Sequence, residues 1–142
     1  VSTVREKAKE LAEKLEKDWV IIDGSPGIGC PVIASLTDVD YALVVIESTV
    51  SGIHDAERVV SVARHFSIPV FAVINKSDIN PEMTSRIVSY AAKEKIPCIA
   101  HIPFDEGVVH AVAEGKTIME HEKTEVKDCI RALWDHIRGT VD

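Results

Sequence analysis

The sequence contains little cysteine and has no obvious metal-binding cysteine pattern. Only three cysteines occur among its 142 residues, Cys30, Cys98 and Cys129, and no two of them form a C-x-x-C pair. An odd number of cysteines at such wide spacing argues against a disulfide framework and against a zinc site built within one short segment. We therefore expect a reducing, cytoplasmic environment.

Basic clusters and long apolar stretches are also missing. The chain has 16 Lys and Arg against 23 Asp and Glu, a formal net charge of −7, and no run of basic residues. Binding a polyanion needs a basic patch, so we expect neither nucleic acid nor an anionic membrane as a partner. No apolar stretch approaches the roughly 20 residues of a membrane-spanning helix, and the charged opening is not typical of a signal peptide. The first residue is Val, not Met, which leaves open that the sequence is part of a longer one.

The apolar residues that are present form short runs separated by helical patterns. Each run is continuous and rich in Val and Ile, as expected of strands buried on both faces of a parallel sheet. The runs cover residues 19–22, 42–46, 70–74 and 98–102. Helical periodicity covers residues 3–17, 52–66, 82–95 and 122–138. We predict one α/β domain over residues 1–142, with its last helix packed on the sheet.

Ligands of open parallel sheets bind beyond the carboxyl ends of the strands, and polar residues follow each predicted strand. Asp23 ends the first apolar run and is followed by the glycine-rich segment 24–29. An aspartate in this position is typical of a Mg²⁺ site beside nucleotide phosphates, where glycines allow backbone N–H groups to approach a γ-phosphate. The alternative is that Asp23 caps the following segment and the glycines form a plain turn.

The third apolar run is followed by Asn75, Lys76, Ser77 and Asp78. This tetrapeptide fits an N-K-x-D base-recognition turn, in which the Asn and Asp side chains hydrogen-bond a purine edge. Its composition is equally that of an ordinary polar turn. The motif leaves guanine as well as adenine open.

A phosphate-binding loop of the form G-x-x-x-x-G-K-[ST] is not found in the sequence. Gly115, Lys116 and Thr117 match its end, but His110 stands where its first glycine is required. The residues before them, 106–114, also have a helical pattern, whereas a strand should precede the loop. The sequence thus has metal and base elements without the phosphate loop.

Four blocks of this sequence together resemble the MinD/ParA/Mrp group of P-loop ATPases, which includes the nitrogenase iron protein. More narrowly, the chain resembles MinD-type ATPases with a ferredoxin-like insert in their N-terminal half. The blocks are residues 18–35, centred on 22–35, then 51–55, 70–78, and the segment 102–116, which matches at 102–105 and at 114–116.

The resemblance implies ATP or ADP with Mg²⁺ as ligands and a three-layer parallel sheet of the P-loop NTPase type. Asp23 would be the Walker B carboxylate, and Gly24 to Gly29, including Gly27, would form the switch turn that senses the γ-phosphate. Asn75 would face the adenine beside Asp78, and the backbone near Pro103 and Asp105 would line the base pocket. The Walker A loop and the ferredoxin insert lie upstream in that family and are missing here, so this chain by itself does not provide for ATP hydrolysis.

Cys30 follows Asp23 by seven residues, a spacing similar to that of the cluster cysteine of the nitrogenase iron protein. A [4Fe–4S] cluster takes four thiolates, so Cys30 would share it with a second subunit, with an N-terminal half, or with an iron–sulfur or redox partner. The alternative is that Cys30 is a small buried apolar residue. Cys98 and Cys129 are expected in the core.

In P-loop ATPases of this kind, the strand before the Walker A loop lies between the Walker B strand and the strand that follows it in sequence. By that analogy residues 19–23 and 42–46 should not be paired. We expect an upstream segment, or a strand of a second molecule, to fill the gap between them. A different hypothesis is a nucleotide-independent α/β adaptor that has lost the phosphate loop.

Overall fold

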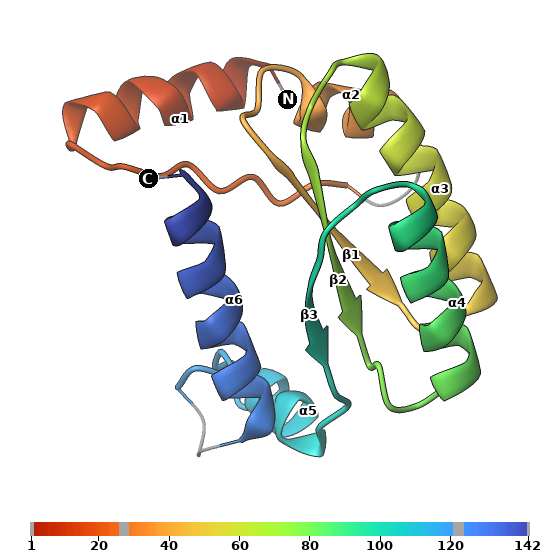
Figure 1. The fold of residues 1–142 in the computed structure, drawn as a ribbon. Coiled ribbons are helices and arrows are strands. Elements are labelled where there is room, and N and C mark those ends of the chain that lie inside the picture. Colours follow the sequence, from red (N-terminus) through yellow and green to blue (C-terminus); the bar gives the residue numbers. More distant parts are fainter. Residues whose placement is uncertain (1, 26–28, 121–123, 142) are drawn as a thin grey trace.

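The computed structural model describes residues 2–25, 29–120 and 124–141 (Figure 1). Between residues 42 and 102, strands and helices alternate, with two helices before this unit and two after it. The helices are α1 (Ser2–Lys14), α2 (Cys30–Leu36), α3 (Val50–His65), α4 (Pro81–Lys93), α5 (Glu106–Ala113) and α6 (Glu125–Val141). The strands are β1 (Ala42–Glu47), β2 (Val70–Asn75) and β3 (Cys98–Ile102).

The three strands form one parallel sheet in the order β1-β2-β3. Ala42 pairs with Val70 at the start of β1, and Glu47 pairs with Asn75 at its end. The β2–β3 register is interrupted once, between Ala72 and Val73. The α/β fold class and the parallel sheet predicted from the Val- and Ile-rich runs are confirmed.

The strand predicted at residues 19–22 is wrong. Residues 17–25 form neither a helix nor a strand, and they connect α1 to α2 as an extended segment (Figure 1). Val20 is 45% exposed and Ile21 is 79% exposed. A strand needs a neighbour to satisfy its N–H and C=O groups, and no described strand lies beside this segment. Residues 19–23 are not paired with β1, whose partner in the described sheet is β2. Because they form no strand, the expected gap between two strands stays a prediction.

Helices cover both faces of the sheet (Figure 1). On one face α3 and α4 build the main core, in which Ile74 and Ile87 are fully buried. On the other face Phe71 of β2 meets His136 of α6, with ring centroids 6.4 Å apart. The apolar side of α6 lies against the protein as predicted, because Val126 is buried and Ile130 is half-buried. None of the described helices is long and apolar enough to cross a membrane.

The edge strand β1 leaves apolar side chains uncovered on the face opposite α3. Ala42 and Ile46 are buried, whereas Leu43 is 39% exposed and Val45 is 59% exposed. The apolar stripe of α1 is similarly open, and its Leu11 is 54% exposed. Parallel sheets are normally covered on both faces. The exposed apolar side chains of β1 therefore resemble a surface that is usually buried.

Candidate functional site

Three helices begin at the edge where the parallel strands end, and each start is capped by a polar side chain. Thr49 caps α3, Asn80 caps α4 and Asp105 caps α5. Their side-chain oxygens accept hydrogen bonds from Gly52 N at 3.0 Å, Met83 N at 3.1 Å and Gly107 N at 2.6 Å. Capping residues satisfy N–H groups that the first helical turn leaves unpaired. The caps therefore fix where each helix starts beside the carboxyl edge.

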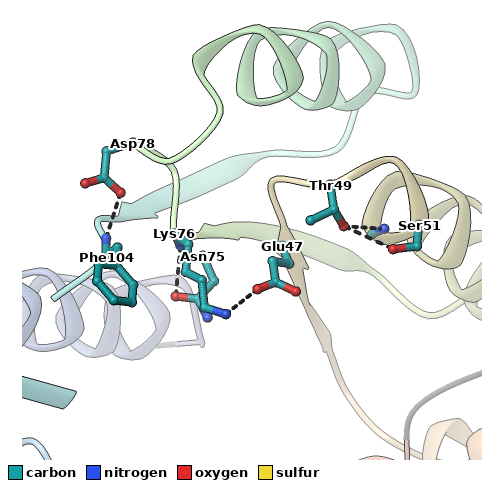
Figure 2. A network of polar contacts seen from close by, with 8 residues as sticks. Glu47, Thr49, Ser51, Asn75, Lys76, Asp78 and Phe104 are labelled. Atoms are coloured by element: carbon teal, nitrogen blue, oxygen red, sulfur yellow. Dashed lines mark hydrogen bonds and ion pairs between the residues drawn. The ribbon is translucent and has the colours of Figure 1, made fainter. Parts of the chain in front are cut away.

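The junction between β1 and α3 is unusually tight at Gly52. A Cβ at this position would lie 2.3 Å from the carbonyl oxygen of Glu47 and 3.1 Å from Thr49 Oγ1. Only glycine lets the first turn of α3 approach the end of β1 so closely. The close approach places Thr49 and Ser51 beside the end of β1 (Figure 2).

Strand β2 ends at Asn75, and Lys76 begins a turn that faces the end of β1 (Figure 2). Lys76 has a φ of +52°, and its backbone N–H donates to Asn75 Oδ1 at 3.0 Å. The ammonium group of Lys76 forms an ion pair with Glu47. Both side chains are nearly half exposed, so this pair contributes less than about 1 kcal/mol to stability. It nevertheless brings the ends of β1 and β2 together.

The next residues of this turn are bonded to the end of β3. Ser77 N donates to Ile102 O at 3.0 Å, and Asp78 Oδ1 accepts from Phe104 N at 2.7 Å (Figure 2). The structure thus brings four of the predicted base-site residues to one edge: Asn75, Asp78, Pro103 and Asp105. Pro103 and Asp105 are half-buried and flank Phe104.

The predicted phosphate-side residues do not join this group. Asp23 and Gly24 lie exposed in the extended segment 17–25, and no hydrogen bond or ion pair among the described residues links Asp23 to the carboxyl edge. Gly27 lies outside the described residues. The expected convergence of four strand ends therefore holds for three, because the segment before Asp23 forms no strand.

Cys30 is exposed at the first position of α2, so the interpretation of it as a buried apolar residue is wrong for this structure. Within the described ranges, no group of three or more His, Cys, Asp or Glu side chains is placed to hold a metal ion. Cys98 and Cys129 are partly buried, and burial raises the pKa of each thiol. Near Cys129 the carboxylates of Glu125 and Asp128 raise the pKa further.

Two residues that hold the edge together, Ser48 and Thr84, were not predicted from the sequence. Ser48 Oγ lies 2.8 Å from Thr84 Oγ1, and Thr84 donates to the carbonyl oxygen of Ser77 at 2.7 Å. Ser48 is only 4% exposed. A small hydroxyl residue directly after a buried strand was the one signal available for Ser48. Nothing in the sequence pairs it with a residue 36 positions later.

Two known proteins are similar in sequence to most of this chain, and both are much longer than it. No protein-family model matches the chain. It is 32% identical over 134 residues to the uncharacterized protein MJ0578 of Methanocaldococcus jannaschii, which covers 94% of this chain and 44% of that protein. It is 28% identical over 101 residues to the uncharacterized protein MJ0579 of the same organism, covering 71% of this chain and 33% of the relative.

Solved structures of MinD and ParA proteins share the fold. The MinD cell division protein of Aquifex aeolicus matches with a TM-score of 0.79 at 23% identity, over 94% of this chain and 58% of its own. The MinC:MinD complex from the same organism matches with a TM-score of 0.77 at 23% identity, over 94% and 57%. A ParA family ATPase from Chlorobium tepidum TLS matches with a TM-score of 0.68 at 20% identity, over 85% and 52%.

These matches show that the chain has the fold of the MinD and ParA ATPases, as the resemblance predicted. The chain spans 33% and 44% of the length of the two relatives and 58% of the Aquifex aeolicus MinD chain.

Proposed function

We propose that this chain is the C-terminal portion of a MinD-like, nucleotide-binding ATPase. The observation that carries the proposal is the grouping of Asn75, Asp78, Pro103 and Asp105 at the carboxyl edge of a MinD-like sheet. In this proposal the edge forms the base side of an ATP site. The phosphate side is completed by residues from the part of the protein that corresponds to the remainder of its relatives.

The base side is supported by the groups that the edge leaves available. Asn75 Oδ1 accepts from its neighbouring backbone N–H, which leaves the amide NH₂ as a donor for a ring nitrogen of a purine. Pro103 and Asp105 flank Phe104 in the loop that the β2–α4 turn holds in place. The backbone of this loop would line the base pocket.

The phosphate side rests on Asp23 and on the glycine-rich turn that begins at Gly24. Asp23 is exposed and makes no hydrogen bond with the described residues, so its carboxylate is available. Carboxylate oxygens suit Mg²⁺, which usually keeps several waters and one or two such ligands beside the nucleotide phosphates. Asp23 would act as the Walker B residue, with Gly27 in the switch turn. Mg²⁺ would supply charge stabilisation at the γ-phosphate when bound.

The proposal also includes a [4Fe–4S] cluster, with Cys30 as one of its ligands. Its exposure at the start of α2 supports access to a partner subunit or an iron–sulfur partner protein. Among the described residues Cys30 belongs to no group of three or more metal-binding side chains, and the sequence has only three cysteines, so further thiolates would come from a second copy or from the upstream half. The residues of this chain alone therefore do not fit a complete cluster.

Anaerobic reconstitution with iron and sulfide tests the cluster in the protein from the full reading frame. Visible absorbance from a bound cluster is expected, and Cys30→Ser should abolish it while Cys98→Ser should not. Equal iron uptake by the wild-type and Cys30→Ser proteins would exclude Cys30 as a ligand. The ATPase proposal would be unaffected by that result.

The ATPase proposal itself is tested by Asp23→Asn in the same full-length protein. The substitution keeps the side-chain volume but removes the charge that favours the metal, so Mg²⁺-dependent hydrolysis should fall while the fold stays intact. Asp135→Asn, at an exposed position on α6, is the matched control and should leave turnover unchanged. Unchanged turnover in Asp23→Asn would show that Asp23 is not a metal-site residue.

The alternative function, a nucleotide-independent adaptor, is distinguished by the coding sequence before Val1. A strand followed by a glycine-rich loop ending in Gly-Lys-Ser or Gly-Lys-Thr supports the ATPase. A start codon directly before Val1 supports the adaptor.

A homodimer in which a second molecule supplies the missing strand would also complete the edge of β1.

A further inference from the structure

Hydrogen bonds cross the carboxyl edge from the end of β1 to the β2–α4 turn. Ser48 follows β1 and is almost fully buried, and Thr84 lies in the first turn of α4. The Thr84 hydroxyl has a single proton, which it donates to the carbonyl oxygen of Ser77 at 2.7 Å. Ser48 therefore donates to Thr84 Oγ1 over the 2.8 Å that separates the two oxygens. The buried hydroxyls are satisfied and join β1, α4 and the turn.

A second group of bonds continues from this turn to the loop after β3. Both the backbone N–H and the hydroxyl of Ser77 donate to Ile102 O, at 3.0 and 3.3 Å. One residue further, Asp78 Oδ1 accepts from Phe104 N at 2.7 Å (Figure 2). We call Ser48, Thr84, Ser77 and Asp78 the carboxyl-edge brace, because together they fasten the ends of all three strands.

We propose that Asp78 is a positioning residue, which holds loop 103–105 against the β2–α4 turn, and that the rest of the carboxyl-edge brace supports it. The inference rests on the proposed nucleotide site, since that loop is its base side. A carboxylate that recognises guanine must accept from both N1–H and the exocyclic amino group, which uses both oxygens. In this structure one of those oxygens already accepts from Phe104.

The carboxyl-edge brace predicts how the proposed nucleotide site discriminates between adenine and guanine. Because Asp78 Oδ1 already accepts from the loop, the N1–H and amino donors of guanine would compete with the Phe104 N–H for the same carboxylate. Adenine does not require this carboxylate as an acceptor, because the Asn75 amide can donate to one of its ring nitrogens. The site should therefore prefer an adenine nucleotide, and the preference should depend on the loop being held.

Two pairs of variants of the 142-residue chain test whether Asp78 holds loop 103–105 in position. Asp78→Ala removes the acceptor for Phe104 N–H, whereas Asp78→Asn keeps an oxygen acceptor. Thr84→Val removes the hydroxyl in the same volume, whereas Thr84→Ser keeps it. By NMR, hydrogen exchange at the Phe104 amide should become about tenfold faster in Asp78→Ala and be largely restored in Asp78→Asn. Thr84→Val should accelerate it less, and Thr84→Ser should not.

The same proteins are titrated with AMP and with GMP, and the amide shifts of residues 75–78 and 103–105 are followed. We expect AMP to bind more tightly than GMP, a several-fold weaker AMP affinity in Asp78→Ala, and recovery in Asp78→Asn. Asp135→Ala, at an exposed position on α6, is the control and should match the wild type. A general loss of structure would also shift amides far from the edge, which positioning does not require.

Two results would overturn the inference. One is an unchanged Phe104 exchange rate in Asp78→Ala. The other is tighter binding of GMP than of AMP that Asp78→Ala abolishes, since Asp78 would then contact the base directly. If neither nucleotide shifts these amides at millimolar concentration, the base pocket of the proposed function is wrong, and Phe104 exchange alone decides whether Asp78 holds the loop.

Discussion

Gly52 is the residue at which one added methyl group should disturb the carboxyl edge most. The carbonyl oxygen of Glu47 lies 2.3 Å from the position of a Cβ at Gly52, and this neighbour is backbone that cannot rotate away. Gly52→Ala should therefore lower the free energy of unfolding by about 1–3 kcal/mol, measured by urea denaturation.

Gly139→Ala in α6 is the matched control for Gly52→Ala. A Cβ at Gly139 meets no heavy atom within 4 Å. The same substitution should here be neutral or stabilising by up to about 1 kcal/mol, because alanine favours the helix. Equal stability of both variants would contradict the close packing of α3 on β1.

The three thiols should differ in reactivity according to their burial. Burial raises the pKa of Cys98 and of Cys129, so a smaller fraction of each is thiolate at a given pH, and the thiolate is the nucleophile. Alkylation by iodoacetamide, followed by mass spectrometry across pH, should modify exposed Cys30 first. The rates at Cys98 and Cys129 should rise only at higher pH than for an ordinary thiol. Equally fast modification of Cys98 and Cys30 at pH 8 would contradict their placement.

At the scale of elements, the segment before Asp23 is attached to α6 by an aromatic pair. Trp19 and Trp134 meet edge to face, with ring centroids 5.1 Å apart and an interplanar angle of 61°. A double-mutant cycle with Trp19→Leu and Trp134→Leu, measured by urea denaturation, should give a coupling of about 0.5–1.5 kcal/mol. Additive effects of the two substitutions would mean that the segment is not packed on α6.

The elements also show what hydrophobic pattern can predict and what it cannot. The runs at 42–46, 70–74 and 98–102 became strands because each lies beside another strand. The run at 19–22 is equally apolar. An apolar pattern predicts only that the side chains are buried, whereas a strand also needs a neighbouring strand to pair with its backbone. Helix α2 was not predicted, since its seven residues are too few to display a clear helical period.

The candidate site was predictable where it depends on neighbours in sequence. Asn75 and Asp78 follow a strand directly, so their place at the carboxyl edge could be predicted. The bonds from Ser48 to Thr84 and from Asp78 to Phe104 join residues 36 and 26 positions apart. Such contacts depend on how the helices pack, and a single sequence does not reveal that.

At the scale of the whole molecule, the open edge of β1 should make the isolated chain associate with itself. An edge strand presents unpaired N–H and C=O groups, and here Leu43 and Val45 add exposed apolar surface beside them. Val45→Lys should reduce association in sedimentation velocity, because a charge on this face disfavours burial. Val112→Lys on α5, at a position 70% exposed, is the control and should change little. A wild-type chain that remains monomeric at high concentration would contradict an incomplete sheet.

We propose that this chain carries the base side of an ATP site, and that its phosphate side needs residues from the remainder of the protein in addition to Asp23 and the glycine-rich turn. Titration calorimetry with Mg-ATP tests it most directly, on the 142-residue chain and on the protein from the full reading frame. We expect weak binding to the chain alone, with a dissociation constant well above micromolar, and clearly tighter binding to the full-length protein. A micromolar or tighter constant for the chain alone would contradict it, because roughly 8 kcal/mol of binding would then arise without a phosphate loop.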